Sequence, residues 1–219
     1  MALAFDAVTS GQANGGGPFT FSHTTSGSNR VLVVGFVIYA GGSFTVTGIT
    51  YNGVAMTAIP SSAITGTYAV GLYGLIAPAS GANTVSISVS GNVEIGFGAM
   101  SFTGADQTTP FGTANTATGT STTPSVTVSS ASGEIVVDTG QIFHSGTLSV
   151  GGGQTSRWSS VSTGGWVKHF GSTEPGDTSV TMSWSNTTSQ DWALSAVPVK
   201  PVSAAGTTIR QLCLTGVGT

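Results

Sequence analysis

The sequence predicts an all-β protein, an antiparallel β-sandwich of the jelly-roll kind. Three observations lead to this prediction. Apolar and polar residues alternate with a period of two in many short stretches, turn residues (Gly, Asn, Ser and Pro) separate these stretches, and helix signals are nearly absent. Because long connections join some of the stretches, a sandwich is favoured over the alternative of an open β-barrel.

Strands are expected wherever alternating or β-branched residues run between two turn signals. In chain order they are expected at about Leu3–Val8, Phe19–His23, Arg30–Tyr39, Ser43–Tyr51, Val54–Ile59, Tyr68–Ala77, Asn83–Val89, Val93–Thr103, Ser125–Ser130, Glu134–Phe143, Trp158–Phe170, Ser179–Trp184 and Asp191–Val199. These stretches predict more than about a third of the residues in strands and under about a tenth in helices.

Two turns and one long connection join the predicted strands. Asn52 and Gly53 predict a tight hairpin turn, because both residue types accept the positive φ that a type I′ turn requires. Ser90–Asn92 predicts a second hairpin by the same logic. The Thr-rich stretch Gln107–Ser125 has almost no strand pattern and is interpreted as a surface crossover between two sheets.

The expected core consists of large apolar residues on the inward side of these strands. Its members are Val31, Val33, Phe36, Leu72, Leu75, Val85, Ile87, Phe97, Phe102, Val126, Val128, Val136 and Ile142.

The composition excludes several classes of protein. Only 6% of the 219 residues are charged, against about 25% in a typical protein, so hydroxyl groups and backbone must make the surface polar. The five Lys and Arg residues are scattered along the chain, whereas a nucleic-acid surface needs clustered cations. No apolar run approaches the ~18 residues of a membrane helix.

Residues 1–201 are expected to form a single sandwich domain, and residues 202–219 a C-terminal docking tail. Pro198 and Pro201 end the last strand, since proline cannot donate a ladder hydrogen bond. The tail is too short to fold alone, so its apolar side chains need a partner surface. The expected assembly residues are Ile209, Arg210, Leu212 and Leu214.

No motif for catalysis or cofactor binding stands out in the sequence. The spacing of the histidines does not match a metal site, and there is no G-x-S-x-G elbow. Asp138 and His144 lie near one strand, but a structural role is favoured over an acid–base pair. Glu94, Asp106 and Glu134 are interpreted as structural acids near strands and turns. The prediction is therefore a non-enzymatic protein without catalytic residues and without a cofactor.

Two groups of residues suggest ligands as lesser alternatives. Glu174 and Asp177 share the loop "GSTEPGDTS" and could begin a Ca²⁺ site, although its Pro-Gly turn explains the same loop. Exposed aromatic rings stack on sugar rings, so all four tryptophans are candidates for glycan contact, and core packing is the favoured explanation for at least two of them. The tryptophans are Trp158, Trp166, Trp184 and Trp192.

Three stretches carry a family resemblance. They are "SGSNRVLVVGF", "VTGITYNGVAMTAI" and "GAMSFTGADQTTPFGT", the last followed by "TSTTPSVTVSSASGEIVVD". In this order they resemble a recurring β-sandwich module of phage structural proteins, such as decoration and head-fibre proteins, which also occurs in bacterial extracellular multidomain proteins. The resemblance covers about Ser26–Asp138 and extends more weakly to Val199. Its motifs are structural, so it implies a fold and a setting and brings no catalytic residues.

The start of the chain fits the phage setting. "MALAFDAVTS" has neither the basic region nor the apolar stretch of a secretory signal. The resemblance then implies a virion structural protein, a capsid decoration or fibre component, made in the host cytoplasm and exposed on the particle surface. The expected partners are copies of the chain itself, a trimer among the alternatives, and a capsid or other particle protein. No nucleic acid or membrane is expected.

Three other functions stay open at this point. One is an extracellular carbohydrate-binding or adhesive module, for which surface glycans would be the partner. Another is a subunit of an extracellular filament, in which a terminal strand completes a neighbour's sheet. The third is a glycan-cleaving enzyme, which needs two acids facing one cleft.

Overall fold

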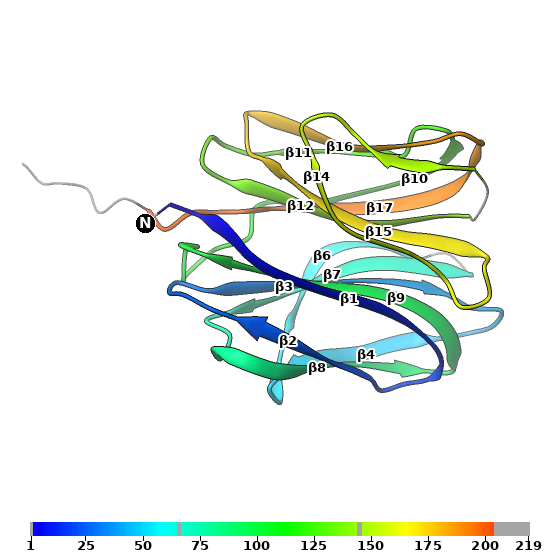
Figure 1. The fold of residues 1–219 in the computed structure, drawn as a ribbon, viewed down its shortest axis with the longest axis horizontal. Coiled ribbons are helices and arrows are strands. Elements are labelled where there is room, and N and C mark those ends of the chain that lie inside the picture. The colour runs from blue at the N-terminus through cyan, green and yellow to red at the C-terminus, as the bar shows by residue number, and fades with distance from the viewer. Residues whose placement is uncertain (1, 65–66, 144–145, 204–219) are drawn as a thin grey trace, which may run out of the picture.

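The computed structural model describes residues 2–64, 67–143 and 146–203, and these residues form β-strands without a helix (Figure 1). The strands are β1 (Ala4–Gly16), β2 (Phe19–Thr25), β3 (Val31–Tyr39), β4 (Thr45–Tyr51), β5 (Val54–Ala55), β6 (Thr57–Ile64), β7 (Tyr68–Ile76), β8 (Gly81–Ser90), β9 (Asn92–Thr103), β10 (Asn115–Ser121), β11 (Ser125–Ser129), β12 (Ile135–Phe143), β13 (Leu148–Val150), β14 (Thr155–Val161), β15 (Val167–Pro175), β16 (Ser179–Asn186) and β17 (Gln190–Val199). The neighbouring strands pair antiparallel. The predicted all-β antiparallel sandwich is confirmed.

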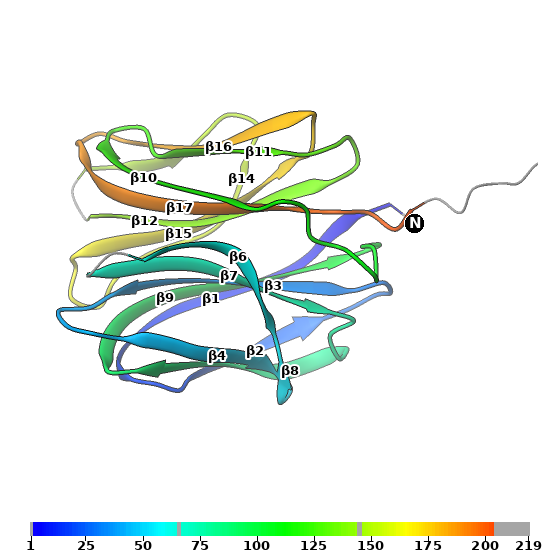
Figure 2. The same cartoon turned by 180° about the vertical axis from the view of Figure 1, so that it is seen from behind.

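The strands form four sheets stacked as layers (Figures 1 and 2). From one side of the stack to the other, the sheets have the orders β2-β8-β4-β5, β1-β9-β3-β7-β6, β10-β17-β12-β15-β14 and β11-β16-β13. We call these the outer and inner N-terminal sheets and the inner and outer C-terminal sheets. Three clusters of buried apolar residues fill the three spaces between the layers.

The two halves of the stack, β1–β9 and β10–β17, have the same topology. Each inner sheet begins with the first strand of its half, followed by the last strand and then the third. In both halves the second strand pairs with the second-to-last strand in the outer sheet. This nested pairing is that of a jelly roll. The predicted jelly roll therefore occurs twice within the range that the sequence analysis treats as one sandwich.

The central strand β3 shows why the inner sheets are so apolar. Leu32 and Val34 face the outer N-terminal sheet, whereas Val31 and Val33 face the C-terminal half. A strand that is covered on both sides needs apolar residues at every position instead of at alternate ones. The run "VLVVGFVIY" is such a strand, and its first eight residues are buried.

The two inner sheets contact each other through equivalent positions of their central strands. An added Cβ at Gly35 on β3 would lie 2.8 Å from Thr139 on β12, and each of these residues is the fifth of its strand. Tyr39 and Phe143, the ninth residues, make an edge-to-face ring contact with 5.8 Å between centroids. The two central strands therefore run in the same direction across the interface.

Glycines in the inner N-terminal sheet make room for large side chains from the other half. A side chain at Gly96 would overlap the ring of His169, and one at Gly98 would overlap the indole of Trp158. Both large side chains are buried. The interface between the halves is thus complementary, with small residues on one sheet and large residues on the other.

Most of the expected local features are present. Asn52 and Gly53 have φ values of 50° and 76°, and they join β4 to β5 as the predicted hairpin turn. Every predicted core residue is buried except Leu75, which is half-buried.

The expectation of a hairpin at Ser90–Asn92 is wrong. These residues join β8 in the outer N-terminal sheet to β9 in the inner one, so they form a corner between sheets. The Thr-rich stretch contains the edge strand β10, and Trp158–Phe170 is divided into β14 and β15 by a turn. The short strand β13 had no predicted counterpart.

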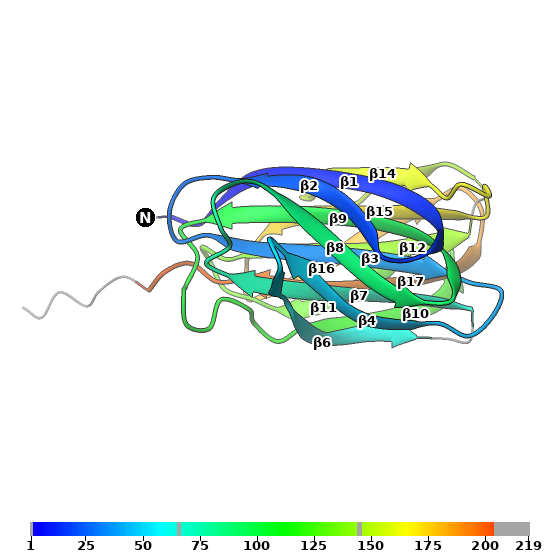
Figure 3. The same cartoon turned by 90° about the horizontal axis from the view of Figure 1, so that it is seen from below.

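The stack has two distinct ends (Figure 3). At one end lie the first and last described residues, where the N–H of Val202 donates to the carbonyl oxygen of Gly104. We call it the terminal end. At the other end lie the turns that follow β1 and β3 and the turn between β14 and β15, and we call it the far end. Because β1 runs the whole way over 13 residues, the two ends are about 40 Å apart.

Candidate functional site

Most acids of the chain act as structural hydrogen-bond acceptors. Asp106 caps its own turn, as predicted, by accepting from the N–H groups of Thr108 and Thr109 at 2.7 and 2.8 Å. Glu134 likewise accepts from the Ser130 hydroxyl, at 2.9 Å. The other acids with such partners are Asp6, Asp138, Asp177 and Asp191. Within the described residues, only Glu94 and Glu174 have a buried carboxylate oxygen without a hydrogen-bond partner.

Asp138 lies inside the C-terminal half. Its carboxylate accepts hydrogen bonds from the hydroxyl of Ser172 and from the indole N–H of Trp184, both at 2.8 Å, and also from the backbone N–H of Ser172. Burial raises the pKa of Asp138 to about 6, although these donors act in the opposite direction. Its predicted companion His144 lies outside the described residues. An interior carboxylate fixed by such donors has a structural role.

The two described histidines are also buried. Burial lowers the pKa of both His23 and His169 to about 4, so both rings are neutral at pH 7. His23 shares a hydrogen bond of 3.0 Å with the hydroxyl of Thr9. His169 lies opposite Gln141 in the inner C-terminal sheet and faces the other half. Neither ring reaches the surface, where it could act on a substrate.

The tryptophans divide into three core residues and one surface residue. Trp158, Trp184 and Trp192 have exposed fractions of 4%, 3% and 7%, so these candidates for glycan contact are covered by protein. Trp184 donates to Asp138, and Trp192 donates to the hydroxyl of Ser121 at 2.9 Å. Trp166 is 62% exposed and lies in the turn between β14 and β15. It alone keeps the exposure that sugar stacking requires.

Trp166 borders a groove of about 230 Å³ at the far end of the stack, which we call the Trp166 groove. Asn14 from β1, Tyr39 from β3 and Glu94 from β9 contribute to its wall, so four separate segments meet there. The full lining is Asn14, Tyr39, Ala40, Gly41, Asn92, Val93, Glu94 and Trp166. All of these except Trp166 belong to the N-terminal half, so the groove exists only because the two halves are stacked.

Within the groove, Glu94 and Trp166 are neighbours. Both the Glu94 carboxylate and the edge of the Trp166 indole lie so close to Gly164 that a Cβ there would overlap them. Gly164 thereby lets the turn bring the carboxylate beside the indole. Glu94 was predicted to have a structural role, and Asn14 was missed because the first strand was expected to end at Val8. Tyr39 and Asn92 were expected in a strand and a turn, and nothing local in the sequence indicates that they meet Trp166.

The Glu174 loop forms a second groove, of about 540 Å³. Glu174 and Asp177 both line it, and burial raises the pKa of Glu174. However, Asp177 already accepts from the N–H of Thr178 at 2.7 Å. The described residues contain no group of three or more His, Cys, Asp or Glu side chains that could hold a metal ion. Ca²⁺ at this loop stays a prediction without geometric support.

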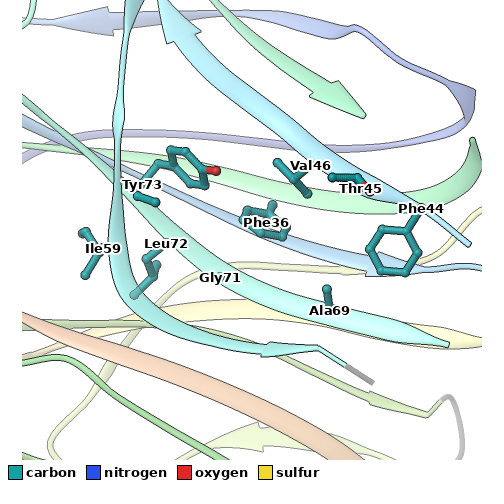
Figure 4. Close-up of a pocket in the computed structure, with 10 residues that line it drawn as sticks. Phe36, Phe44, Thr45, Val46, Ile59, Ala69, Gly71, Leu72 and Tyr73 are labelled. Carbon is teal, nitrogen blue, oxygen red and sulfur yellow. The ribbon is translucent and has the colours of Figure 1, made fainter. Parts of the chain in front are cut away.

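A third pocket, of about 240 Å³, lies at the edge of the N-terminal half (Figure 4). Its lining is Phe36, Phe44, Thr45, Val46, Ala58, Ile59, Ala69, Gly71, Leu72 and Tyr73. Only Thr45 and Tyr73 among these bring a side-chain hydroxyl, and none of them is charged. A specific ligand site needs a few placed polar groups, so this pocket suggests no particular ligand.

Some of the predicted features lie beyond what the structure describes. Ile209, Arg210, Leu212 and Leu214, the expected assembly residues, fall outside the described residues. Among the described residues, no helix is long and apolar enough to cross a membrane.

Comparisons of the chain with protein-family models, with curated proteins and with solved structures found no match. The resemblance to phage structural modules therefore stays a prediction from the sequence. The function has to be argued from the geometry of the chain itself.

Proposed function

We propose that the chain is a non-enzymatic structural protein of a virion, displayed on the particle surface as a decoration or fibre component. The difference between the two ends of the four-layer stack is the observation that supports this function best. The described chain ends lie together at the terminal end (Figure 1). The Trp166 groove lies at the far end, beside the turn between β14 and β15. A body attached at the terminal end would present the far end to its surroundings.

The fold suits this role. Jelly rolls occur in viral capsid and lectin domains, where the two sheets protect their edges within a compact body. Two of them packed through a buried, largely apolar interface give a stiff spacer whose long strands extend from one end to the other. The few charges are also consistent with a surface made of hydroxyl groups.

The roles of the acids support a non-enzymatic function. Six of them accept structural hydrogen bonds, and the two described histidines are buried. Glu94 and Glu174 line different grooves, whereas a glycosidase needs two acids facing one cleft.

Attachment is assigned to the tail that begins at Val202. The species that attaches to the particle would be an oligomer of the chain, since repeated contacts over a lattice favour symmetric assemblies. Ser203 is the last described residue, and the preceding Val202 is held beside Gly104 by a backbone hydrogen bond.

The test is immunogold electron microscopy of particles purified from lysed cells that make the chain. We expect regular labelling of intact particles by antibodies against the recombinant protein. A chain truncated after Ser203 should fold and should no longer be incorporated. Bare particles accompanied by labelled cell envelopes or free filaments would contradict the proposal and favour the adhesive or filament alternative.

A further inference from the structure

We propose that the Trp166 groove is a binding site for a neutral carbohydrate. The proposal concerns the isolated protein and does not depend on whether the chain is part of a virion. It starts from the exposure of Trp166, which is the only aromatic residue among the large hydrophobics that are exposed in the described chain. An indole face of this kind is costly to leave in water and matches the apolar C–H face of a pyranose ring.

The polar groups around the indole fit hydroxyl groups. Glu94 brings a carboxylate beside the indole, and a carboxylate accepts hydrogen bonds only. Asn14 and Asn92 are exposed and line the groove. Because an amide both donates and accepts, this set pairs with sugar hydroxyls in either role.

One oxygen of Glu94 is left without a partner by the protein. Oε2 is buried and makes no hydrogen bond with any residue in the described ranges. A buried acceptor of this kind is costly to the folded state unless a donor reaches it. A sugar hydroxyl at the mouth of the groove would be such a donor, because a small rotation of the Glu94 carboxylate would bring Oε2 within its reach.

The charges near the groove favour a neutral ligand. None of its lining residues is a cation. The nearest basic residue along the chain, Lys168, donates to the carbonyl oxygen of Gly146 and is 8% exposed. Uronates and sialylated glycans would therefore meet a carboxylate without a compensating positive charge. A quaternary amine would stack on the indole but would leave the two amides without partners.

The experiment is an NMR titration that follows the four indole N–H signals of the full chain. The probes are maltohexaose, cellohexaose and N-acetylchitohexaose, with polygalacturonate and choline as charged comparisons. We expect at least one neutral hexasaccharide to shift the Trp166 signal while the signals of the three buried tryptophans stay in place.

Calorimetric titration with the hexasaccharide that shifts the Trp166 signal measures the affinity of the variants. Trp166→Ala should weaken the binding roughly tenfold or more, because the stacking surface is lost. Glu94→Ala should weaken it several-fold. Val54→Ala is the matched control, since Val54 is also exposed, at 55%, but lies on the β4–β5 hairpin. This control should bind like the unmodified chain, and all three variants should keep its melting temperature within a few degrees.

Three results would overturn the proposal. The first is the absence of any Trp166 shift with all three neutral probes at millimolar concentration. The second is unchanged binding by Trp166→Ala. The third is tighter binding of polygalacturonate or choline than of every neutral probe, which would assign the groove to a charged ligand. None of these results bears on immunogold labelling of particles, so the two proposals fail separately.

Discussion

At the fourth position of its central strand the N-terminal half has Val34, and the C-terminal half has Asp138. Both residues point into the core between the inner and outer sheets of their own half. Val34 lies among apolar residues, whereas Asp138 accepts hydrogen bonds from Ser172 and Trp184. The strand order is thus compatible with an apolar or a polar interior, provided that the polar group finds donors.

A second pair of equivalent positions faces the interface between the halves. Val37 lies opposite Val70 in the inner N-terminal sheet, and Gln141 lies opposite His169 in the inner C-terminal sheet. The same interface is therefore apolar on one side and partly polar on the other. This asymmetry gives the two halves different surfaces, so each sheet is suited to the other and not to a copy of itself.

The largest effect is expected from placing the acid of one half into the other half. Val34→Asp should destabilise the protein by more than about 4 kcal/mol, because Val34 is fully buried in a cluster of apolar side chains. The reverse exchange, Asp138→Val, should cost about 1–3 kcal/mol for the donors that lose their acceptor. Urea unfolding measures both values. A smaller loss for Val34→Asp than for Asp138→Val would show that the two interiors are not different in the way described.

The second-largest loss of stability is expected from substituting a glycine of the interface between the halves. Gly98→Val should cost about 1–3 kcal/mol or more, because its side chain would overlap Trp158 and push the inner sheets apart. The control is Gly48→Val on β4, where an added Cβ meets nothing within 4 Å. Thermal melts should show a lower melting temperature for the first variant and little change for the second. Equal effects of the two would argue against close packing at Gly98.

The pH dependence should distinguish the two halves more finely. Since burial raises the folded-state pKa of Asp138 to about 6, above the usual 3.8, the native state binds more protons than the unfolded state between these values. The stability contributed by Asp138 is thus present at pH 4 and falls as the pH rises to about 6. Relative to Asp138→Asn, the unmodified chain should lose roughly 2–3 kcal/mol between pH 4 and pH 7.

Urea unfolding of both proteins at the two pH values checks this prediction, and the histidines cancel because both proteins contain them. A difference that stays constant with pH, or grows in favour of the unmodified chain, would mean that the three donors outweigh the burial of Asp138.

The smallest effect is expected at Trp166. Trp166→Ala should change the free energy of unfolding by less than about 0.5 kcal/mol, because this indole is mostly in solvent. Trp192→Ala should cost about 3–5 kcal/mol, since Trp192 lies in the C-terminal core. Denaturant melts of the two variants would reveal an unrecognised structural role of Trp166 if the costs were similar.

Alternation and turn residues were sufficient to predict most of the sandwich. β3 and β12 were predicted to within a residue, since in both of them β-branched and aromatic residues run between two turn signals. β10 was missed because it is an edge strand rich in Thr. Such a strand needs few buried side chains, so its sequence lacks the regular apolar alternation by which strands were predicted. The duplication of the jelly roll was also missed, because equivalent strands such as β3 and β12 share few residues.

The candidate site could be predicted only in part. Trp166 was among the predicted glycan contacts, but periodicity alone could not separate it from three buried tryptophans. Glu94, Asn14 and Tyr39 come from strands that are far apart in sequence and meet only through the stacking of the halves. The sequence contains no local signal for such a meeting.

The central claim is that the two jelly rolls form one cooperative body through the interface at Gly96 and Gly98. Equilibrium urea unfolding followed by two signals tests it most directly. Tryptophan fluorescence reports on the C-terminal half and on the interface, because all four tryptophans lie at residues 158–192 and Trp158 packs against Gly98. Amide hydrogen exchange of β3, β7 and β9 reports on the N-terminal half. We predict a single transition with the same midpoint for both signals. Two separate midpoints would contradict the claim and would show two jelly rolls that fold independently.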